Sequence, residues 1–295
     1  MEALGILALL SGPVAVSALE MGVHVPRHLR IARAVTRTPS SPPAAYVLMS
    51  VAADSAVSRT VVVTDMDETL ITRKSTGYII AFLVRYRAFL RLACALPLAL
   101  VLIPLSKVSR SLAVRLMYWL AFRGVRVDKA QQIASTFLSE RYVRDLQDPA
   151  ASAVLAADES FILTASPEFM ARPWLERFLS VPPANVFGAA LKQRNGRFTG
   201  ATADIPIGEA KAELLRAIDI GDATTVGYGD HPTDVPFLLE CSRGVLVTSA
   251  DEPVQPLDPL PDGIECEAAL PLEGSRVEAL LEQSRRGSDA AVTRQ

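Results

Sequence analysis

Cysteine and histidine are scarce in this chain, with three of each among 295 residues. Cys94, Cys241 and Cys266 are odd in number and far apart, which excludes a disulfide framework and a cysteine zinc motif and favours a reducing compartment. His24 and His28, four residues apart in an arginine-rich segment, indicate a solvated helix face rather than a metal pair. The net charge of −2 predicts no nucleic-acid partner for the chain as a whole.

Acidic residues are missing from one long stretch of the sequence. Between positions 69 and 127 there are ten Lys or Arg residues and no Asp or Glu, whereas from Asp128 onward 26 acids outnumber 15 bases. A block this basic, in a chain that is 50% hydrophobic, indicates contact with a membrane surface or an anionic ligand. A solvated helical face is the alternative interpretation.

No uninterrupted hydrophobic run near the N-terminus is long enough to predict a straight membrane-spanning helix. Residues 3–19 (ALGILALLSGPVAVSAL) are uncharged, but Gly12-Pro13 interrupts them and no basic segment precedes them. We interpret residues 1–45 as an apolar leader, either an anchor or a poorly ordered segment, followed by a basic linker that ends in TPSSPPAA. If residues 3–19 insert into a membrane, the arginines after them favour the cytoplasmic side, although an organelle transit peptide has a similar composition.

Four short apolar runs predict the strands of a parallel sheet. They are 60–64 (TVVVT), 160–164 (SFILT), 224–228 (TTVGY) and 244–248 (GVLVT). Their hydrophobicity is continuous rather than alternating, which is typical of strands covered by helices on both faces. We therefore expect an α/β fold with a doubly wound, Rossmann-like sheet formed by residues 59–70 and 158–250. In such sheets ligands bind beyond the carboxyl ends of the strands.

Nearly a hundred residues separate the first two predicted strands, too many for a simple crossover. We interpret residues 71–157 as a helical cap inserted after the first strand. Its uncharged segment LACALPLALVLIPL (92–105) contains two prolines, which favours a re-entrant or interfacial segment, with a buried hairpin as the alternative. The Pro- and acid-rich stretch 251–295 is expected to be disordered, apart from a short helix at 275–285.

The sequence VVVTDMDETL (61–70) runs an apolar strand directly into Asp65, Asp67 and Glu68. Clustered carboxylates repel one another and resist desolvation, so such a cluster indicates a bound cation or a proton to be transferred. The cluster follows a predicted strand, at the edge where an open α/β sheet binds its ligands.

Further polar groups follow in chain order: Thr164 at the end of the second strand, Lys211 near the start of a helix, and Gly229-Asp230 with Asp234 after the third strand. With the first cluster they form the motifs DMDETL, ILTASP, GEAKAELL and GYGDHPTDVPFL. Together these resemble the four motifs of the haloacid dehalogenase superfamily of phosphotransferases. Their order, with three of them directly after predicted strands, is far more specific than D-x-D-x-T alone.

The resemblance implies a role for each motif residue. Asp65 is the nucleophile that forms an aspartyl-phosphate, and Asp67 is the general acid that protonates the leaving alcohol and then, as general base, activates water. Thr164 binds a phosphoryl oxygen, and Lys211 supplies a fixed positive charge. Ser166 either contacts the phosphate or starts the following helix.

The same resemblance implies Mg²⁺ as the cofactor. An anionic nucleophile that meets an anionic phosphate needs a cation, and hard oxygen ligands select Mg²⁺. The implied ligands are the side chains of Asp65 and Asp230 and the backbone carbonyl of Asp67, with Asp234 in support. On the residues alone, Asp67 also fits as a cap of the next helix. His231 is expected at a variable loop position and not as a ligand.

The long insert between the first two motifs resembles the branch that contains phosphoserine phosphatase, which also has a β-hairpin like LKQRNGRFTG (191–200). That enzyme needs a cap glutamate for the substrate ammonium, and because no acid lies between 69 and 127, phosphoserine is a poor substrate candidate. RYVRDL, ILTASPEFMARPWLERFL and IGEAKAEL are more similar to the N-terminal phosphatase-like domain of land-plant glycerol-3-phosphate acyltransferases, over about 59–250. The His-x-x-x-x-Asp motif of their acyltransferase domain does not follow, since no histidine lies after His231.

These residues predict a Mg²⁺-dependent phosphomonoester hydrolase at a membrane surface. The basic, apolar cap suits a small phosphorylated substrate of lipid character, such as lysophosphatidate or glycerol 3-phosphate. Three alternatives stay open. The first is a catalytically idle domain that binds a membrane or a lipid enzyme as a regulatory module. The others are a soluble phosphoserine-phosphatase-like enzyme and a phosphotransferase that passes the phosphoryl group to an alcohol other than water.

Overall fold

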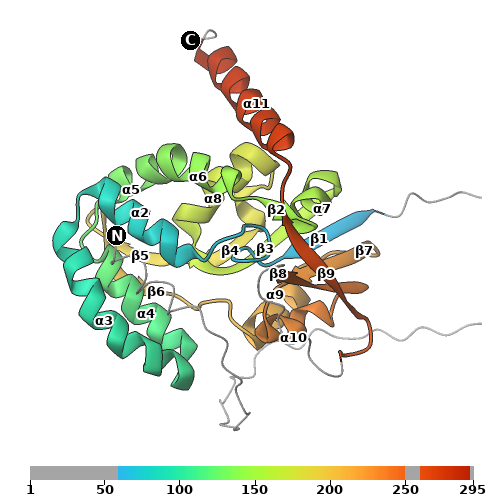
Figure 1. Cartoon of the computed structure of the whole chain (residues 1–295), viewed down its shortest axis with the longest axis horizontal. Helices are drawn as coiled ribbons and strands as arrows, with labels where there is room; N and C mark the ends of the chain where they lie inside the picture. The colour runs from blue at the N-terminus through green and yellow to red at the C-terminus, as the bar shows by residue number, and fades with distance from the viewer. Residues whose placement is uncertain (1–58, 250–259, 293–295) are drawn as a thin grey trace, which may run out of the picture. The chain divides into compact units, whose positions relative to one another are not determined.

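The computed structural model describes residues 59–249 and 260–292, and the leader, anchor and linker predicted within 1–45 lie outside the described residues. The described part is built on a seven-stranded sheet in the order β2-β9-β8-β7-β1-β3-β4 (Figure 1). The strands are β1 (Thr60–Thr64), β2 (Gln147–Asp148), β3 (Glu159–Pro167), β4 (Val186–Ala189), β7 (Thr224–Gly229), β8 (Arg243–Ser249) and β9 (Ile264–Pro271). All pairings are parallel except that of β2 with β9.

Helices cover both faces of the sheet, which explains the continuous hydrophobicity of its central strands. Val62 of β1 packs into one hydrophobic cluster with Trp174, whereas Val61 and Val63 pack into a second cluster with Phe237. The first face carries α6 (Ser139–Arg144), α7 (Ala150–Ala156) and α8 (Glu168–Leu179), and the second carries α9 (Glu209–Ala217) and α10 (Val235–Leu238). The prediction of a doubly wound α/β fold is therefore confirmed.

Only part of the predicted insert 71–157 lies outside the core, because β2 pairs with β9 and because α6 and α7 pack on the first face of the sheet. We call the helical part before α6 the cap. It contains α2 (Ser75–Tyr86), α3 (Phe89–Val108), α4 (Arg110–Phe122), α5 (Val127–Ile133) and a π-helical turn (Ala134–Leu138) before α6. α3 continues through both of its prolines. Arg91 donates to the carbonyl of Leu120 at 2.8 Å, which ties the start of α3 to the end of α4 in an antiparallel pair. Among the described residues, no helix combines the length and the apolar character needed to cross a membrane.

A two-stranded hairpin extends from the core beside the cap, as the sequence predicts. β5 (Leu191–Arg194) pairs antiparallel with β6 (Arg197–Thr202). Asn195 and Gly196 connect them with φ of 51° and 67°. Two successive residues in the left-handed region form the turn whose twist matches the flanking strands, and the Asn-Gly pair adopts it at little cost.

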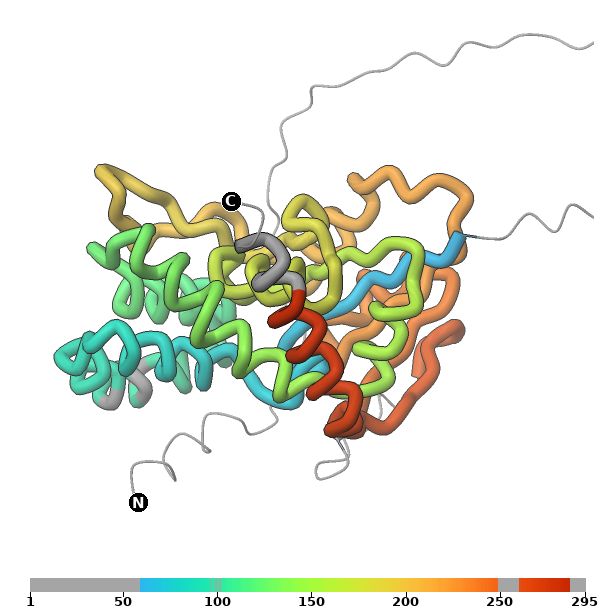
Figure 2. The backbone as a smooth tube through the Cα atoms, turned by 90° about the horizontal axis from the view of Figure 1, so that it is seen from above, coloured from blue at the N-terminus to red at the C-terminus, as the bar shows by residue number. Residues whose placement is uncertain are grey.

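Within the described residues 260–292, the prediction of disorder is wrong outside 275–285, where the predicted short helix lies inside a longer one. β9 extends the sheet beside β8, and α11 (Gly274–Val292) follows on the side of α6 and α8 (Figures 1 and 2). Leu272, Val277 and Leu281 are buried in the larger hydrophobic cluster. The acidic and proline-rich composition of this segment by itself suggests disorder. Its few apolar residues nevertheless pack against the hydrophobic core and order the segment.

Leu281→Ala is expected to lower the free energy of unfolding by about 2–4 kcal/mol, because Leu281 is only 2% exposed and its truncation leaves a cavity. Leu270→Ala in β9 is the matched control, since Leu270 is 57% exposed and should cost no more than about 0.5 kcal/mol. Urea denaturation of both variants measures the difference. Equal stabilities would contradict the packing of α11 on the core.

Candidate active site

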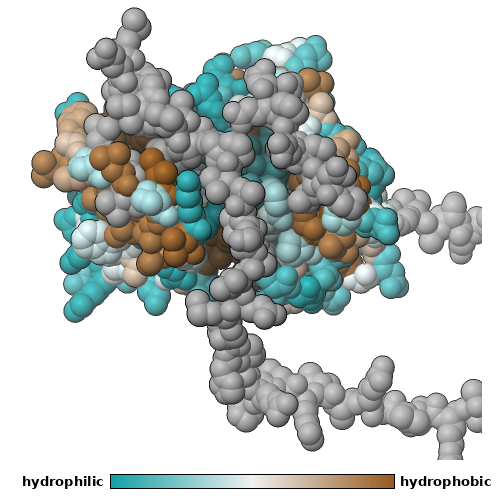
Figure 3. Space-filling model, turned by 60° about the horizontal axis from the view of Figure 1, so that its bottom comes forward, coloured by the Kyte–Doolittle hydropathy of each residue, from teal (hydrophilic) through white to brown (hydrophobic). Residues whose placement is uncertain are grey.

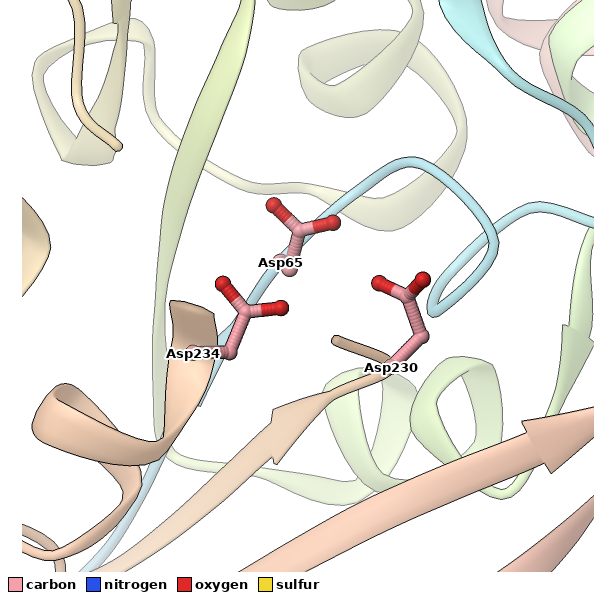
Figure 4. Close-up of side chains that lie close together, drawn as sticks. All are labelled: Asp65, Asp230 and Asp234. Carbon is pink, nitrogen blue, oxygen red and sulfur yellow. The ribbon is translucent and has the colours of Figure 1, made fainter. Parts of the chain in front are cut away.

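Three neighbouring strands end side by side at the candidate active site. β1 lies between β7 and β3, and both pairings are parallel, so the carboxyl ends of the three strands meet at one edge of the sheet. Asp65 follows β1, Asp230 follows β7, and Thr164 lies in the last part of β3. The carboxylates of Asp65, Asp230 and Asp234 point toward a common space (Figure 4).

The Lys211 ammonium lies between two of these carboxylates. Its Nζ is 2.5 Å from Oδ1 of Asp65 and 2.6 Å from Oδ1 of Asp234. All three side chains are buried, and Lys211 is only 4% exposed. A buried lysine is tolerated only when its charge is paired, so the first turn of α9 positions this residue for the site rather than for solvent.

Asp234 reaches Lys211 because β7 ends in a glycine. A Cβ on Gly229 would lie 2.6 Å from the Cβ of Asp234, so any larger residue there would push Asp234 away. The other oxygen of Asp234 accepts a hydrogen bond from the backbone N–H of His231 at 3.2 Å. Both oxygens of Asp234 are thus engaged by the chain itself, which suits it to hold Lys211 in place.

Asp67 turns toward the cap. Its carboxylate accepts hydrogen bonds from the backbone N–H of Ser75 at 3.0 Å and from the Ser75 hydroxyl at 2.5 Å. The Ser166 hydroxyl lies 3.4 Å from each Asp67 oxygen and also contacts the Ser75 hydroxyl. Ser75 is the first residue of α2, so Asp67 caps that helix and faces the site at the same time. The backbone of Glu68, with φ of 60°, makes the intervening turn.

Ser75 was missed by the sequence reasoning. It lies in KSTG at the start of the cap, and a serine there is typical of any helix N-terminus. Only its contact with Asp67 identifies it as part of the site.

The predicted phosphate-binding residues lie beside this group. The Thr164 hydroxyl accepts a hydrogen bond from the backbone N–H of Ser166 at 3.1 Å, and both residues are buried. From the cap, the Tyr118 hydroxyl donates to the carbonyl of Ala165 at 2.7 Å. Across the site, the Thr69 hydroxyl donates to Asp230 at 3.0 Å. The structure therefore brings all seven predicted positions to one edge of the sheet: Asp65, Asp67, Thr164, Ser166, Lys211, Asp230 and Asp234.

Burial dominates the electrostatics of the site. Burial raises the pKa of Asp65 to about 7; the Lys211 ammonium opposes this rise, while the Asp234 and Asp67 carboxylates add to it. Burial and the negative charges of Asp65 and Asp234 also raise the pKa of Asp230 well above its ordinary value. Burial disfavours the charged form of Lys211, but Asp234 and Asp65 outweigh it and raise the ammonium pKa. Lys211 therefore stays protonated. Its single positive charge does not balance the negative charges of the carboxylates around it.

The donor set fits a hard divalent cation. One oxygen from each of Asp65, Asp230 and Asp234 lies within 4.8 Å of the others, and carboxylate oxygens suit Mg²⁺. Three ionised carboxylates and the Lys211 ammonium leave two negative charges unbalanced, which one divalent cation would neutralise. Because Asp234 is already engaged by Lys211 and a backbone N–H, Asp65 and Asp230 are the better placed ligands.

Comparison with known proteins gives a family and one curated relative. The sequence model of the haloacid dehalogenase-like hydrolase family matches residues 62–239, more than half of the chain, and includes all four motifs. Glycerol-3-phosphate acyltransferase RAM2 of Petunia hybrida is 31% identical over 162 residues. That match covers 53% of this chain and 33% of the relative, so the chain spans about a third of the relative's length.

Two solved structures are also similar to the chain. A protein of unknown function from Bordetella pertussis Tohama I gives a TM-score of 0.47 at 22% identity, and the match covers 64% of this chain and 90% of that one. A probable phosphoserine phosphatase from Vibrio cholerae gives a TM-score of 0.48 at 15% identity, and covers 78% of this chain and 67% of that one.

Mg²⁺ is expected to raise the melting temperature more at pH 8 than at pH 5. The pKa of Asp65 is about 7 in the metal-free fold against an ordinary 3.8, so the folded state binds more protons than the unfolded state between these values. The metal-free protein therefore loses stability as pH rises from about 4 to about 7, and Mg²⁺ restores it most where no proton competes. At a hundredfold excess over its dissociation constant the gain is about 2.7 kcal/mol.

Differential scanning fluorimetry with and without Mg²⁺ measures this gain. Asp230→Asn is the control, because it removes one of the two best placed ligands and should abolish the Mg²⁺-dependent shift at both pH values. A shift of equal size at pH 5 and pH 8, or one that survives in Asp230→Asn, would contradict the metal site.

Proposed function

The chain belongs to the haloacid dehalogenase-like hydrolase family, and we propose that it hydrolyses phosphate monoesters through an aspartyl-phosphate, with Mg²⁺ as cofactor. The observation that carries this proposal is the buried contact of the Lys211 ammonium with Asp65, beside a second acid, Asp67, held by hydroxyl groups. When bound by Asp65, Asp230 and the backbone carbonyl of Asp67, Mg²⁺ would supply the positive charge that lets a carboxylate approach a phosphate.

Asp65 is the nucleophile in this proposal. Its backbone N–H donates to the carbonyl of Tyr228 on β7 at 2.9 Å, and Lys211 holds one of its side-chain oxygens, so the carboxylate is fixed at the sheet edge. A carboxylate oxygen bonds to phosphorus as the bond from phosphorus to the ester oxygen breaks. Lys211 and the Thr164 hydroxyl bind the oxygens of the transferring phosphoryl group.

Asp67 handles the protons of both steps. Burial raises its pKa, although hydrogen bonds from Ser75 oppose the rise, so the side chain is able to hold a proton for the leaving group. It gives this proton to the departing alkoxide. As a carboxylate it then takes a proton from the water that attacks phosphorus, and the bond from phosphorus to Asp65 breaks to release inorganic phosphate.

A phosphorylated glycerol compound is the proposed substrate class. The cap residues from 69 to 127 include ten cations and no acid, so they suit an anionic substrate and offer no carboxylate for the ammonium of phosphoserine. The Petunia relative is named for glycerol 3-phosphate, which supports the same class. We extend it to lysophosphatidate at a membrane surface because the cap is also apolar.

Asp65→Asn is expected to lower turnover of p-nitrophenyl phosphate at least about a thousandfold, since an amide cannot form the acyl phosphate. Asp262→Asn, at an exposed carboxylate in the loop before β9, is the matched control and should retain full activity. When the wild type is mixed with substrate that carries a labelled phosphate and is then quenched with acid, labelled phosphate should remain attached to the protein. Hydroxylamine should release it. Activity of Asp65→Asn near that of the wild type would reject the nucleophile.

A substrate panel tests the lipid assignment. With Mg²⁺, kcat/KM for lysophosphatidate or glycerol 3-phosphate should exceed that for phosphoserine by about tenfold or more, because each well-made charge contact changes binding by about 1.4 kcal/mol or more. Initial rates of phosphate release measure this ratio. A preference for phosphoserine would end the lipid assignment and leave the phosphatase chemistry intact.

A further inference from the structure

The outward side of α3 is apolar along most of its length. Of the ten large hydrophobic residues that are exposed in the described part of the chain, seven lie between Val84 and Trp119. Figure 3 shows hydrophobic residues gathered on the left of the molecule, where α3 and α4 lie in Figure 1. We define the outer face of α3 as its exposed residues before Leu105, which are Phe89, Leu90, Ala93, Cys94, Pro97, Leu100 and Pro104.

This face differs from the outer face of an ordinary surface helix. A helix on the surface of a soluble protein has charged or polar residues on its solvent side, and a helix that is apolar all round is normally buried. Among the described residues of the outer face, none is polar or charged, yet Leu90 is 81% exposed and Leu100 is 73% exposed. The position of α3 at the surface therefore leaves an apolar stripe without a partner in the described part of the chain.

The end of α3 lies beside the catalytic edge. Val108 is 86% exposed, and two residues later Arg110 begins α4. The Arg110 guanidinium is 3.4 Å from Nδ1 of His231, and His231 directly follows Asp230. The C-terminal end of α3 therefore lies close to the loop that carries Asp230.

The charges around the outer face favour an anionic surface over a second copy of this chain. Arg87 precedes α3, and Lys107 and Arg110 lie at its other end, with no acid between 69 and 127. Two copies packed face to face about a two-fold axis would bring these like charges together. The headgroups of an anionic bilayer instead neutralise them, while the acyl region receives the apolar side chains.

The two prolines of the outer face indicate how deep the helix lies. Pro97 and Pro104 have no N–H, so the carbonyls four residues earlier, at 93 and 100, lack their usual helical donor. Such carbonyls need water, which is present at the surface of a bilayer and absent from its hydrocarbon core. The helix is therefore suited to lie in the interface.

We propose that the outer face of α3 docks on an anionic lipid bilayer and holds the active-site edge at the membrane surface. The docking is inferred from the residues of α3 alone. Its role in catalysis rests on the proposed function: a substrate held in the membrane would reach Asp65 past the end of α3. The partner is thus a bilayer with negatively charged headgroups, and neither a neutral bilayer nor a protein.

Two exposed cysteines provide a matched test in the full-length chain. Cys94 lies on the outer face of α3, and Cys266 lies on β9. Burial raises the pKa of Cys241 to about 12, so this third thiol reacts slowly. A nitrobenzoxadiazole probe is attached to Cys94 in Cys266→Ser and to Cys266 in Cys94→Ser. Each protein is mixed with vesicles of phosphatidylcholine and phosphatidylserine at a ratio of roughly 7:3, or of phosphatidylcholine alone.

The Cys94 probe is expected to shift to shorter wavelength and brighten on anionic vesicles, to respond weakly on neutral ones, and to lose its response at high salt. The Cys266 probe should not change. No response at Cys94, or equal responses at both positions, would overturn the proposal, even if another segment binds the vesicles. A Cys94 response that grows with protein concentration in the absence of vesicles would also overturn it, in favour of self-association.

Catalysis gives a second readout. In the double variant Leu90→Glu/Leu100→Glu, hydrolysis of lysophosphatidate in anionic vesicles should fall by about tenfold or more, because two exposed leucines that would enter the bilayer are replaced by negative charges. Hydrolysis of p-nitrophenyl phosphate in solution should not change. Equal loss on both substrates would contradict a docking role. If the wild type hydrolyses neither ester, the proposed function fails, while the Cys94 probe still decides whether α3 docks.

Discussion

The buried ion pairs of Lys211 with Asp65 and Asp234 are the constraint on which the site depends. Removing a charge from water costs several kcal/mol. These buried charges are therefore stable only when the ammonium and the carboxylates lie within hydrogen-bond distance of one another. Three separate parts of the chain supply that geometry: the end of β1, the first turn of α9, and the short turn after β7. Gly229 permits the last of these, because a side chain there would displace Asp234. The excess of carboxylate over ammonium is what makes the site receptive to a divalent cation.

The cap is connected to the candidate active site by hydrogen bonds and does not merely cover it. Ser75 begins the cap helix α2 and holds the Asp67 carboxylate through its N–H and its hydroxyl. Tyr118 of α4 donates to the carbonyl of Ala165, between Thr164 and Ser166. Arg110 extends from the same helix to His231. Any displacement of the cap helices therefore changes the contacts of Asp67, Ala165 and His231, which couples the position of the cap to the geometry of the candidate active site.

The acidic and basic residues that are separated along the sequence also lie in different parts of the structure. The carboxylates of Asp65, Asp230 and Asp234 gather at the sheet edge, whereas the cap from 69 to 127 has cations and no acid. Some of the cap cations have structural roles. Arg91 hydrogen-bonds α3 to α4, and Arg115 hydrogen-bonds Thr202 of β6. Arg87 and Lys107, at the two ends of α3, are exposed instead. With the apolar stripe between them, they support the proposed docking of this side of the cap on a bilayer, beside the proposed phosphatase site.

The sequence by itself determined the fold class, the order of the four motifs and the hairpin at Asn195-Gly196, because strand periodicity, motif spacing and turn chemistry are local properties of the chain. It could not identify Ser75, whose role exists only through its contact with Asp67. It predicted only a short helix at 275–285 and disorder around it, where β9 and the longer helix α11 form, because their few apolar residues are stabilised by surfaces distant in sequence. Tertiary structure alone decided that Asp234 turns to Lys211 and that the apolar side of α3 faces outward. Such outcomes depend on which surfaces remain uncovered once the core has packed.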